Sequence, residues 1–306
     1  MAGAHVHAHH VRGSNDRQAL TIALALIVSF MLAEVVVGIL ADSLALISDA
    51  GHMLTDAAAI ALSLVAARLA SKPAEGAMTY GLGRAEILSA QANGITLLVL
   101  AVLIAWEAAQ RLGSPPQVDA APVLVVALAG VAVNLLAARV LAGAGRESLN
   151  VEGSFRHVVT DLYAFIATAL AAIVILATGF DRADAIASLF VAALMLYSAY
   201  SLLRASGRIF LEAAPEGVDV SAIGNALAAE PHVVQVHDLH VWEVTSGFPA
   251  LSAHVLVERD CDCHAVRARL EGLLEERFAL THTTLQVEHE TPEQLLEIQP
   301  RGDGGA

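Results

Sequence analysis

The hydrophobic positions of the chain fall into six long runs that are separated by short polar segments. The runs cover residues 18–41, 44–70, 86–111, 120–143, 155–179 and 184–204. Each run is close to the ~20 residues that a helix needs to cross a bilayer. The separators carry Gly, Pro, Ser or charged residues, which favour turns. The pattern therefore predicts an α-helical polytopic membrane protein with six transmembrane helices.

From Pro215 the pattern changes to that of a small soluble domain. Apolar residues recur with helical spacing over 220–229 and 263–278, and they alternate with polar residues, as in strands, over 233–244, 250–258 and 283–290. This order predicts an α+β domain in which the helices cover one face of a sheet. Its ~80 residues make a modest core that is marginal alone, so dimerisation would stabilise it.

We accordingly predict four segments. They are a His-rich cytoplasmic N-terminus at 1–16, a six-helix transmembrane domain at 17–204, a cytoplasmic metal-binding and dimerisation domain at 205–292, and a disordered tail at 293–306. The His-rich segment is of a composition that binds metal loosely.

Composition and charge agree with a membrane protein. Hydrophobic residues make up 56% of the chain and charged residues only 16%, which is more apolar than a soluble domain of this length. The formal net charge of −14 leaves no basic surface for phosphates and excludes nucleic acid as a partner. Basic residues flank the runs on the side of the two termini, and only Arg111 and Arg182 flank them on the other side. We therefore expect both termini in the cytoplasm and the helices in the inner membrane.

Two His-x-x-x-Asp pairs interrupt the apolar runs, His52 with Asp56 and His157 with Asp161. Residues four apart share one face of a helix, so each pair presents an imidazole beside a carboxylate. Charged groups are costly inside a bilayer and are candidates for function. Two nitrogens and two oxygens suit a tetrahedral Zn²⁺, with Co²⁺, Cd²⁺ and Fe²⁺ as competitors. The alternative is that both histidines are only hydrogen-bonded residues of the bundle interior.

The positions of the two pairs impose a condition on the helices. Hydropathy places the first pair in the outer half of its helix and the second near the inner end of its helix. The pairs can meet only if both helices continue past the membrane into the cytoplasm. Imidazole and carboxylate also bind protons, so protons compete with the metal for these ligands.

The soluble domain carries a second group of histidines. Two stand in strands, one opens the second helix and one ends the last strand: His237, His254, His264 and His289. We therefore predict that this edge of the domain binds one or two zinc ions, with a cysteine thiolate as an additional ligand.

Five short motifs occur in a characteristic order between residues 17 and 290. They are Asp42-Ser-Leu-Ala-Leu, His52-Met-Leu-Thr-Asp56, Tyr80-Gly-Leu-Gly-Arg84-Ala-Glu86, His157-Val-Val-Thr-Asp161 and Val236-His-Asp-Leu-His-Val-Trp242. In this combination the chain resembles the cation diffusion facilitator family, in its zinc-transporting branch. The resemblance implies a homodimeric Zn²⁺/H⁺ antiporter with six transmembrane helices and a cytoplasmic domain of the ferredoxin-like, metallochaperone-like fold.

The resemblance also implies roles for eight residues of this chain. The ligands of the transport site would be His52, Asp56, His157 and Asp161, and those of a cytoplasmic zinc site would be His237, His254, His264 and His289.

We therefore expect proton-coupled efflux of Zn²⁺ by alternating access between the second and fifth helices. A membrane-embedded zinc sensor or storage protein is the alternative. A metalloenzyme is disfavoured, because the chain contains no His-Glu-x-x-His motif and because four protein ligands leave no open position for a substrate.

Overall fold

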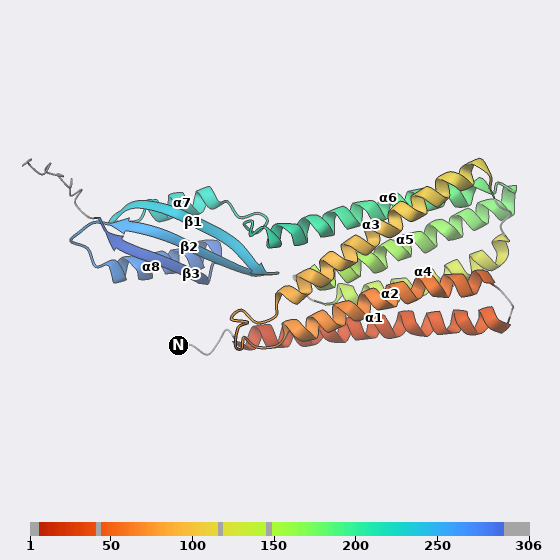
Figure 1. The fold of residues 1–306 in the computed structure, drawn as a ribbon, viewed down its shortest axis with the longest axis horizontal. Helices are drawn as coiled ribbons and strands as arrows, with labels where there is room; N and C mark the ends of the chain where they lie inside the picture. Colours follow the sequence, from red (N-terminus) through yellow and green to blue (C-terminus); the bar gives the residue numbers. More distant parts are fainter. Residues whose placement is uncertain (1–5, 41–43, 116–118, 145–148, 291–306) are drawn as a thin grey trace, which may run out of the picture. The chain divides into compact units, whose positions relative to one another are not determined.

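The structure is a computed structural model that describes residues 6–40, 44–115, 119–144 and 149–290 (Figure 1). The predicted tail at 293–306 and the first two residues of the motif that begins at Asp42 lie outside the described residues. The chain divides into two compact units, Met1–Ala213 with Glu243–Phe248, and Ala214–Trp242 with Pro249–Ala306.

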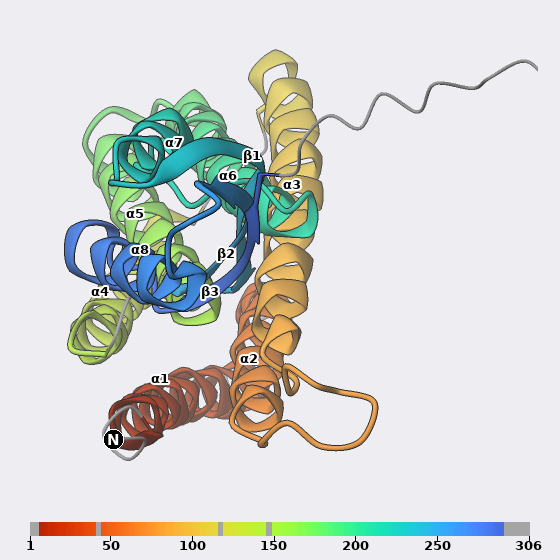
Figure 2. The ribbon, with the colours of Figure 1, turned by 90° about the vertical axis from the view of Figure 1, so that its left-hand side faces the viewer.

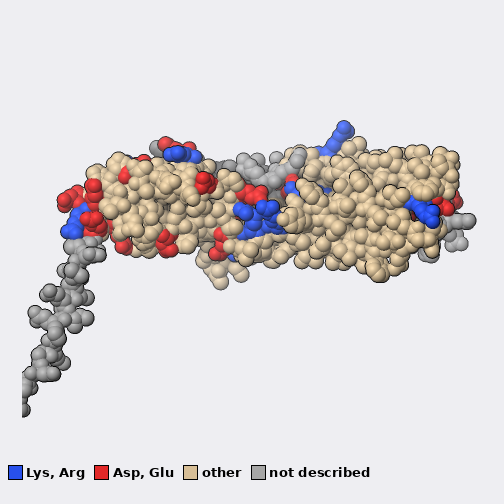
Figure 3. Space-filling model, turned by 90° about the horizontal axis from the view of Figure 1, so that it is seen from above, with Lys and Arg blue, Asp and Glu red and all other residues tan. Residues whose placement is uncertain are grey.

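The first unit contains the six predicted long helices, which confirms the helical membrane domain. They are α1 (Val6–Leu40), α2 (Leu44–Ala70), α3 (Arg84–Gly113), α4 (Ala120–Ala142), α5 (Leu149–Thr178) and α6 (Arg182–Phe210). Within the described residues, five of them hold a stretch long and apolar enough to cross a membrane, and the 27-residue α2 is the sixth. On the face shown in Figure 3, few charged side chains lie between the two ends of this unit.

Three of the helices extend beyond the apolar runs by more than one turn. Helix α1 begins at Val6, α5 begins at Leu149, and α6 continues to Phe210. Hydropathy detects only the part of a helix that faces hydrocarbon, whereas the backbone hydrogen-bond ladder continues through polar residues until a residue stops it. The end of α6 shows such a stop, because Glu212 adopts a left-handed φ of 54° and the N–H of Ala213 bonds back to the carbonyl of Arg208.

The bundle is held together by large apolar side chains and by close helix contacts. Leu20 and Ile27 of α1, Ile60 of α2 and Leu141 of α4 belong to one fully buried cluster. A second cluster joins α3 to α6. Helices α4 and α5 approach closely where Gly130 meets the ring of Phe165, since a Cβ atom at this glycine would overlap the ring. Small residues commonly permit such contacts between membrane helices.

The second unit has the predicted α-β-β-α-β order. Its elements are α7 (Val220–Ala228), β1 (Val233–Thr245), β2 (Phe248–Val257), α8 (Cys263–Phe278) and β3 (His282–His289). The sheet order is β1-β2-β3, and β3 runs parallel to β2 with Ala250 opposite His282 and Val257 opposite His289.

Both helices of this unit cover the same face of the sheet (Figure 2). Leu227 of α7 and Leu270 of α8 pack in one core with Leu251 and Val255, which are alternate residues of β2. The α8 helix begins where the side chain of Asp262 accepts hydrogen bonds from two backbone N–H groups. The predicted α+β fold is confirmed.

Candidate metal centre

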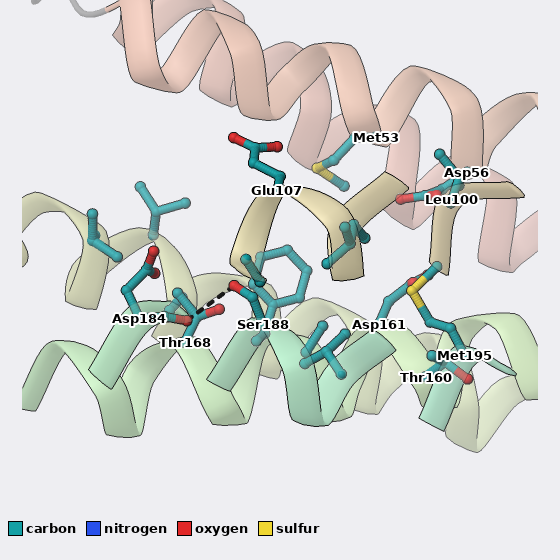
Figure 4. Close-up of a pocket in the computed structure, with 18 of the residues that line it drawn as sticks. Met53, Asp56, Leu100, Glu107, Thr160, Asp161, Thr168, Asp184, Ser188 and Met195 are labelled. Carbon is teal, nitrogen blue, oxygen red and sulfur yellow. Dashed lines mark hydrogen bonds between the residues drawn. The ribbon is translucent and has the colours of Figure 1, made fainter. Parts of the chain in front are cut away.

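Helices α2 and α5 bring three potential metal ligands together inside the bundle. Nε2 of His157 lies 3.0 Å from Oδ1 of Asp56 and 3.7 Å from Oδ2 of Asp161. The three ligand atoms all lie within 4.8 Å of one another. Figure 4 shows both carboxylates beside the same cavity. In the part of the chain that the structure describes, no other group of three such residues is close enough to share one ion.

The fourth predicted ligand is His52. Its backbone belongs to α2, four residues before Asp56, so the two positions share a helix face. Its side chain lies outside the described residues. Its role as a ligand therefore stays a prediction.

Two of the three described ligands have a buried polar atom without a hydrogen-bond partner. His157 is buried, with 2% of its surface exposed. Its Nδ1 and the Oδ2 of Asp161 have no hydrogen-bond partner among the described residues. A hydrogen bond joins Nε2 of His157 to Oδ1 of Asp56, and its hydrogen lies on Nε2 when Asp56 is ionised, because an ionised carboxylate only accepts hydrogen bonds. In that form a hydrogen stands on the nitrogen that a metal ion would need.

A cavity of about 660 Å³ extends from this cluster to the far ends of α3 and α6. Figure 4 shows Asp56 and Asp161 near one end and Glu107 and Asp184 near the other. At that second end Arg111 links the two helices, because its guanidinium lies 2.5 Å from Glu107 and 3.5 Å from Asp184. The cavity gives the ligand cluster a route out of the bundle at this end.

The histidines of the second unit come together only in part. The rings of His237 and His254, on neighbouring strands, have centroids 5.2 Å apart. Nε2 of His254 lies 4.0 Å from Oδ2 of Asp238, whose other oxygen lies 3.0 Å from His240. In regular strand His237 and His240 point to opposite faces. Asp238 lies between them with a φ of 53°, a left-handed conformation that interrupts the regular strand.

The other two predicted ligands lie at the far end of the sheet and the start of α8. Nε2 of His289 lies 3.0 Å from the carbonyl oxygen of Cys261. His264 is the second residue of α8 and uses its backbone N–H on the cap of Asp262. Both thiols of the unit are free, and that of Cys261 donates to the carbonyl of Glu258. Within the described part of one chain, the four histidines do not converge on one point.

Sequence reasoning missed two features of the membrane unit. One is the charged mouth of the cavity, whose signal was Glu107 inside an apolar run. The other is a group of buried serine and asparagine side chains beside the ligand cluster, which no charge marks in the sequence.

Family models match both units of the chain. A cation efflux transmembrane domain matches residues 20–211, and the cytoplasmic domain of cation efflux proteins matches residues 215–290. Among solved structures, the metal-bound C-terminal domain of the CzcD transporter from Cupriavidus metallidurans is 35% identical, with a TM-score of 0.23. The match covers 23% of this chain and 99% of that domain.

Several relatives match over nearly the whole chain. The metal cation efflux system protein CzcD of Cupriavidus metallidurans is 39% identical, over 96% of this chain and 93% of its own length. The cadmium, cobalt and zinc/H⁺-K⁺ antiporter of Bacillus subtilis is 37% identical over 92% of each chain. The zinc transporter ZitB of Escherichia coli is 36% identical over 94% of this chain and 93% of its own length.

Proposed function

The chain belongs to the cation efflux family of membrane transporters, and from this premise we propose that it exports Zn²⁺ from the cytoplasm in exchange for protons. As a family member it is a multi-pass membrane protein that moves metal cations, and it is not an enzyme. The finer assignments that follow concern the ion, the site and the coupling.

The observation that supports the proposal best is the convergence of Asp56, His157 and Asp161 within 4.8 Å of one another. Two carboxylate oxygens and one imidazole nitrogen are ligands that Zn²⁺ accepts, and His52 supplies the fourth. Imidazole favours borderline ions such as Zn²⁺, Cd²⁺ and Co²⁺ over hard ones. Relatives of the chain are named for the same three ions.

Proton exchange follows from the bond between His157 and Asp56. The hydrogen on Nε2 holds the two side chains 3.0 Å apart when no metal is bound. A Zn²⁺ ion needs the lone pair of that nitrogen. A singly protonated ring supplies it by carrying its hydrogen on Nδ1, whereas a doubly protonated ring releases one proton as the ion binds. We take the doubly protonated ring as the metal-free form, so that a proton returning to the nitrogen on the outer side releases the ion and at least one proton moves against each zinc ion.

Both termini lie in the cytoplasm, and the helices lie in the inner membrane. With this orientation the cavity mouth at Glu107 and Asp184 faces the outer side, and we accordingly assign the cavity to an outward-facing state. Alternating access then requires a second state that is open at the other end of the bundle.

The soluble domain dimerises two copies of the chain and carries zinc of its own. His237 and His254 lie beside each other on neighbouring strands, with the carboxylate of Asp238 nearby, and these are donor types that Zn²⁺ accepts. His264 and His289 lie away from this pair, so we assign them to a second zinc ion. Zinc bound here would link folding of the domain to the cytoplasmic zinc concentration.

Transport into proteoliposomes tests the proposal. The protein is reconstituted with a zinc-sensitive dye inside, and a pH gradient is imposed. We expect zinc flux that follows the pH gradient in the parent protein and in the control variant Asp119→Ala. Asp119 is a carboxylate at the start of α4 that does not line the cavity. We expect no flux in Asp56→Ala. A parent that binds zinc but shows no flux would favour the sensor or storage function, and flux indifferent to pH would exclude antiport.

A further inference from the structure

A buried group of polar side chains joins α2, α3 and α5 next to the ligand cluster. Its members are Ser63, Ser89, Asn93, Asn150 and Ser154, and each has at most 3% of its surface exposed. We call these five residues the polar seal. Polar groups are rare in the interior of a bundle unless they are hydrogen-bonded to one another, and this group is.

Ser63 is the centre of the polar seal. Its hydroxyl oxygen lies 2.8 Å from Oγ of Ser154, 3.2 Å from Nδ2 of Asn93 and 3.4 Å from Oγ of Ser89. Its backbone carbonyl accepts a hydrogen bond of 2.7 Å from Nδ2 of Asn150. A single residue of α2 thereby holds both α3 and α5.

One oxygen of the polar seal is left over. Oδ1 of Asn150 is fully buried and has no hydrogen-bond partner in the described part of the chain. An amide oxygen that is buried without a hydrogen-bond partner lowers the stability of a protein. Its presence therefore suggests a function. Amide and hydroxyl oxygens can bind cations, or the water that surrounds a cation. Packing alone accounts for the four other residues but not for this atom.

The polar seal lies on the opposite side of the ligand cluster from the cavity. Ser63 follows Asp56 by two turns of α2, or roughly 10 Å along the helix, and Asn150 precedes His157 by two turns of α5. Both steps lead to the end of the bundle where α3 and α5 begin and α6 ends. None of the five residues lines the cavity. The polar seal therefore separates the ligand cluster from that end of the bundle.

We propose that the polar seal is the inner gate of the transport path and that its oxygens line the entry route for the metal ion. The proposal rests on the export function proposed above. In this structure the gate is closed. When α2, α3 and α5 separate at this end, Asn150 and the serine hydroxyls replace part of the hydration shell of a Zn²⁺ ion moving to His157.

A polar gate suits a step that repeats in every cycle. Hydrogen bonds between helices in membranes are individually weak, so five small side chains can separate without a large barrier. An apolar gate of the same size would close equally well, but it would offer no oxygen to an ion that must shed water. The polar seal thus combines closure with a route for a charged substrate.

Thiol labelling measures whether the gate opens. Ser63→Cys is made in a Cys261→Ser, Cys263→Ser background, and inside-out vesicles are treated with a membrane-impermeant thiol reagent. The matched control is Ala137→Cys. Ala137 is a small, fully buried residue of α4 in the apolar cluster described above, and it lies toward the same end of the bundle as Ser63. During zinc transport we expect Ser63→Cys to react roughly tenfold or more faster than the control, because labelling follows the fraction of time that a site is open.

Substitution of Asn150 measures whether the oxygens matter. Asn150→Leu keeps the volume but removes the amide, and we expect the zinc transport rate to fall about tenfold while equilibrium zinc binding is kept. Asn150→Gln retains both the amide oxygen and an amide donor for the carbonyl of Ser63, and it should restore most of the rate. An Asn150→Leu protein that transports at the parental rate would overturn the entry route.

The two proposals fail in different ways. If the Cys261→Ser, Cys263→Ser protein transports no zinc at all, the export function is wrong, and with it the gate, which rests on that function. A background protein that transports zinc, with Ser63→Cys active yet labelled no faster than Ala137→Cys, would defeat the gate alone.

Discussion

Replacing Asp161 by Asn should abolish transport and yet make the metal-free protein more stable. The carboxylates of Asp56 and Asp161 have ligand atoms within 4.8 Å of each other, and Oδ2 of Asp161 has no hydrogen-bond partner among the described residues. At an effective dielectric constant of about 20, two like charges at this distance repel by roughly 3 kcal/mol. The asparagine keeps the shape of the side chain and removes the repulsion.

The net gain should be smaller than that repulsion. Part of it is screened, because both side chains keep some exposure to the cavity, 21% for Asp56 and 18% for Asp161. The variant also loses any attraction between Asp161 and the ring of His157, 3.7 Å away. We therefore expect the free energy of unfolding without metal to rise by about 1 kcal/mol, the sign being the informative part.

Thermal unfolding in detergent with a chelator measures this effect, and the same melt with zinc measures binding. The parent should gain roughly 2.7 kcal/mol at a free zinc concentration of 100 times Kd, whereas Asp161→Asn should gain little. Asp184→Asn is the matched control, because that carboxylate pairs with Arg111 at 3.5 Å and its loss should lower stability. A metal-free Asp161→Asn protein that melts below the parent would refute the reasoning and make Asp161 a structural residue.

Three further predictions test other parts of the molecule. His52→Asp should admit Mn²⁺ at the expense of Zn²⁺ in proteoliposome flux assays, because a carboxylate is a harder ligand than imidazole, and an unchanged ion preference would place selectivity elsewhere. Residues 213–292 expressed alone should dimerise in sedimentation experiments and melt at higher temperature with zinc, whereas a melting curve indifferent to zinc and chelator would remove the proposed cytoplasmic site. Gly130→Leu should destabilise the bundle by about 1–3 kcal/mol in thermal melts, since its side chain would overlap Phe165, and a parental melting temperature would show that α4 and α5 can separate there.

The sequence was sufficient to predict the helices because bilayer thickness imposes one length on all of them. It was insufficient for their ends, since α1 begins at Val6 and α6 continues to Phe210, where polar residues remain helical. The pairing of His157 with Asp161 followed from helix periodicity alone. The meeting of His157 with Asp56, 101 positions away, was only inferred from two matched polar pairs, and the structure places them in contact.

The polar seal shows what sequence patterns leave out. Serine and asparagine are common enough in membrane helices that no single one stands out. Ser63 and Asn150 are 87 positions apart, and only the packing of α2 against α5 reveals that they share a hydrogen bond. In the soluble unit, similarly, the register of β2 could not be read from the sequence, so the approach of His237 to His254 was not predictable as a distance.

The distribution of the described ligands over two helices has a consequence for how the ion is released. His157 and Asp161 share one face of α5, while Asp56 comes from α2. Ligand atoms on a helix lie about 5–6 Å from its axis, so a rotation of α5 by about 20° carries both of its ligands sideways by roughly 2 Å. That displacement equals the length of a zinc–nitrogen bond. A small rotation of α5 about its axis would thus break coordination to His157 and Asp161 together, and the helices need not move apart for it.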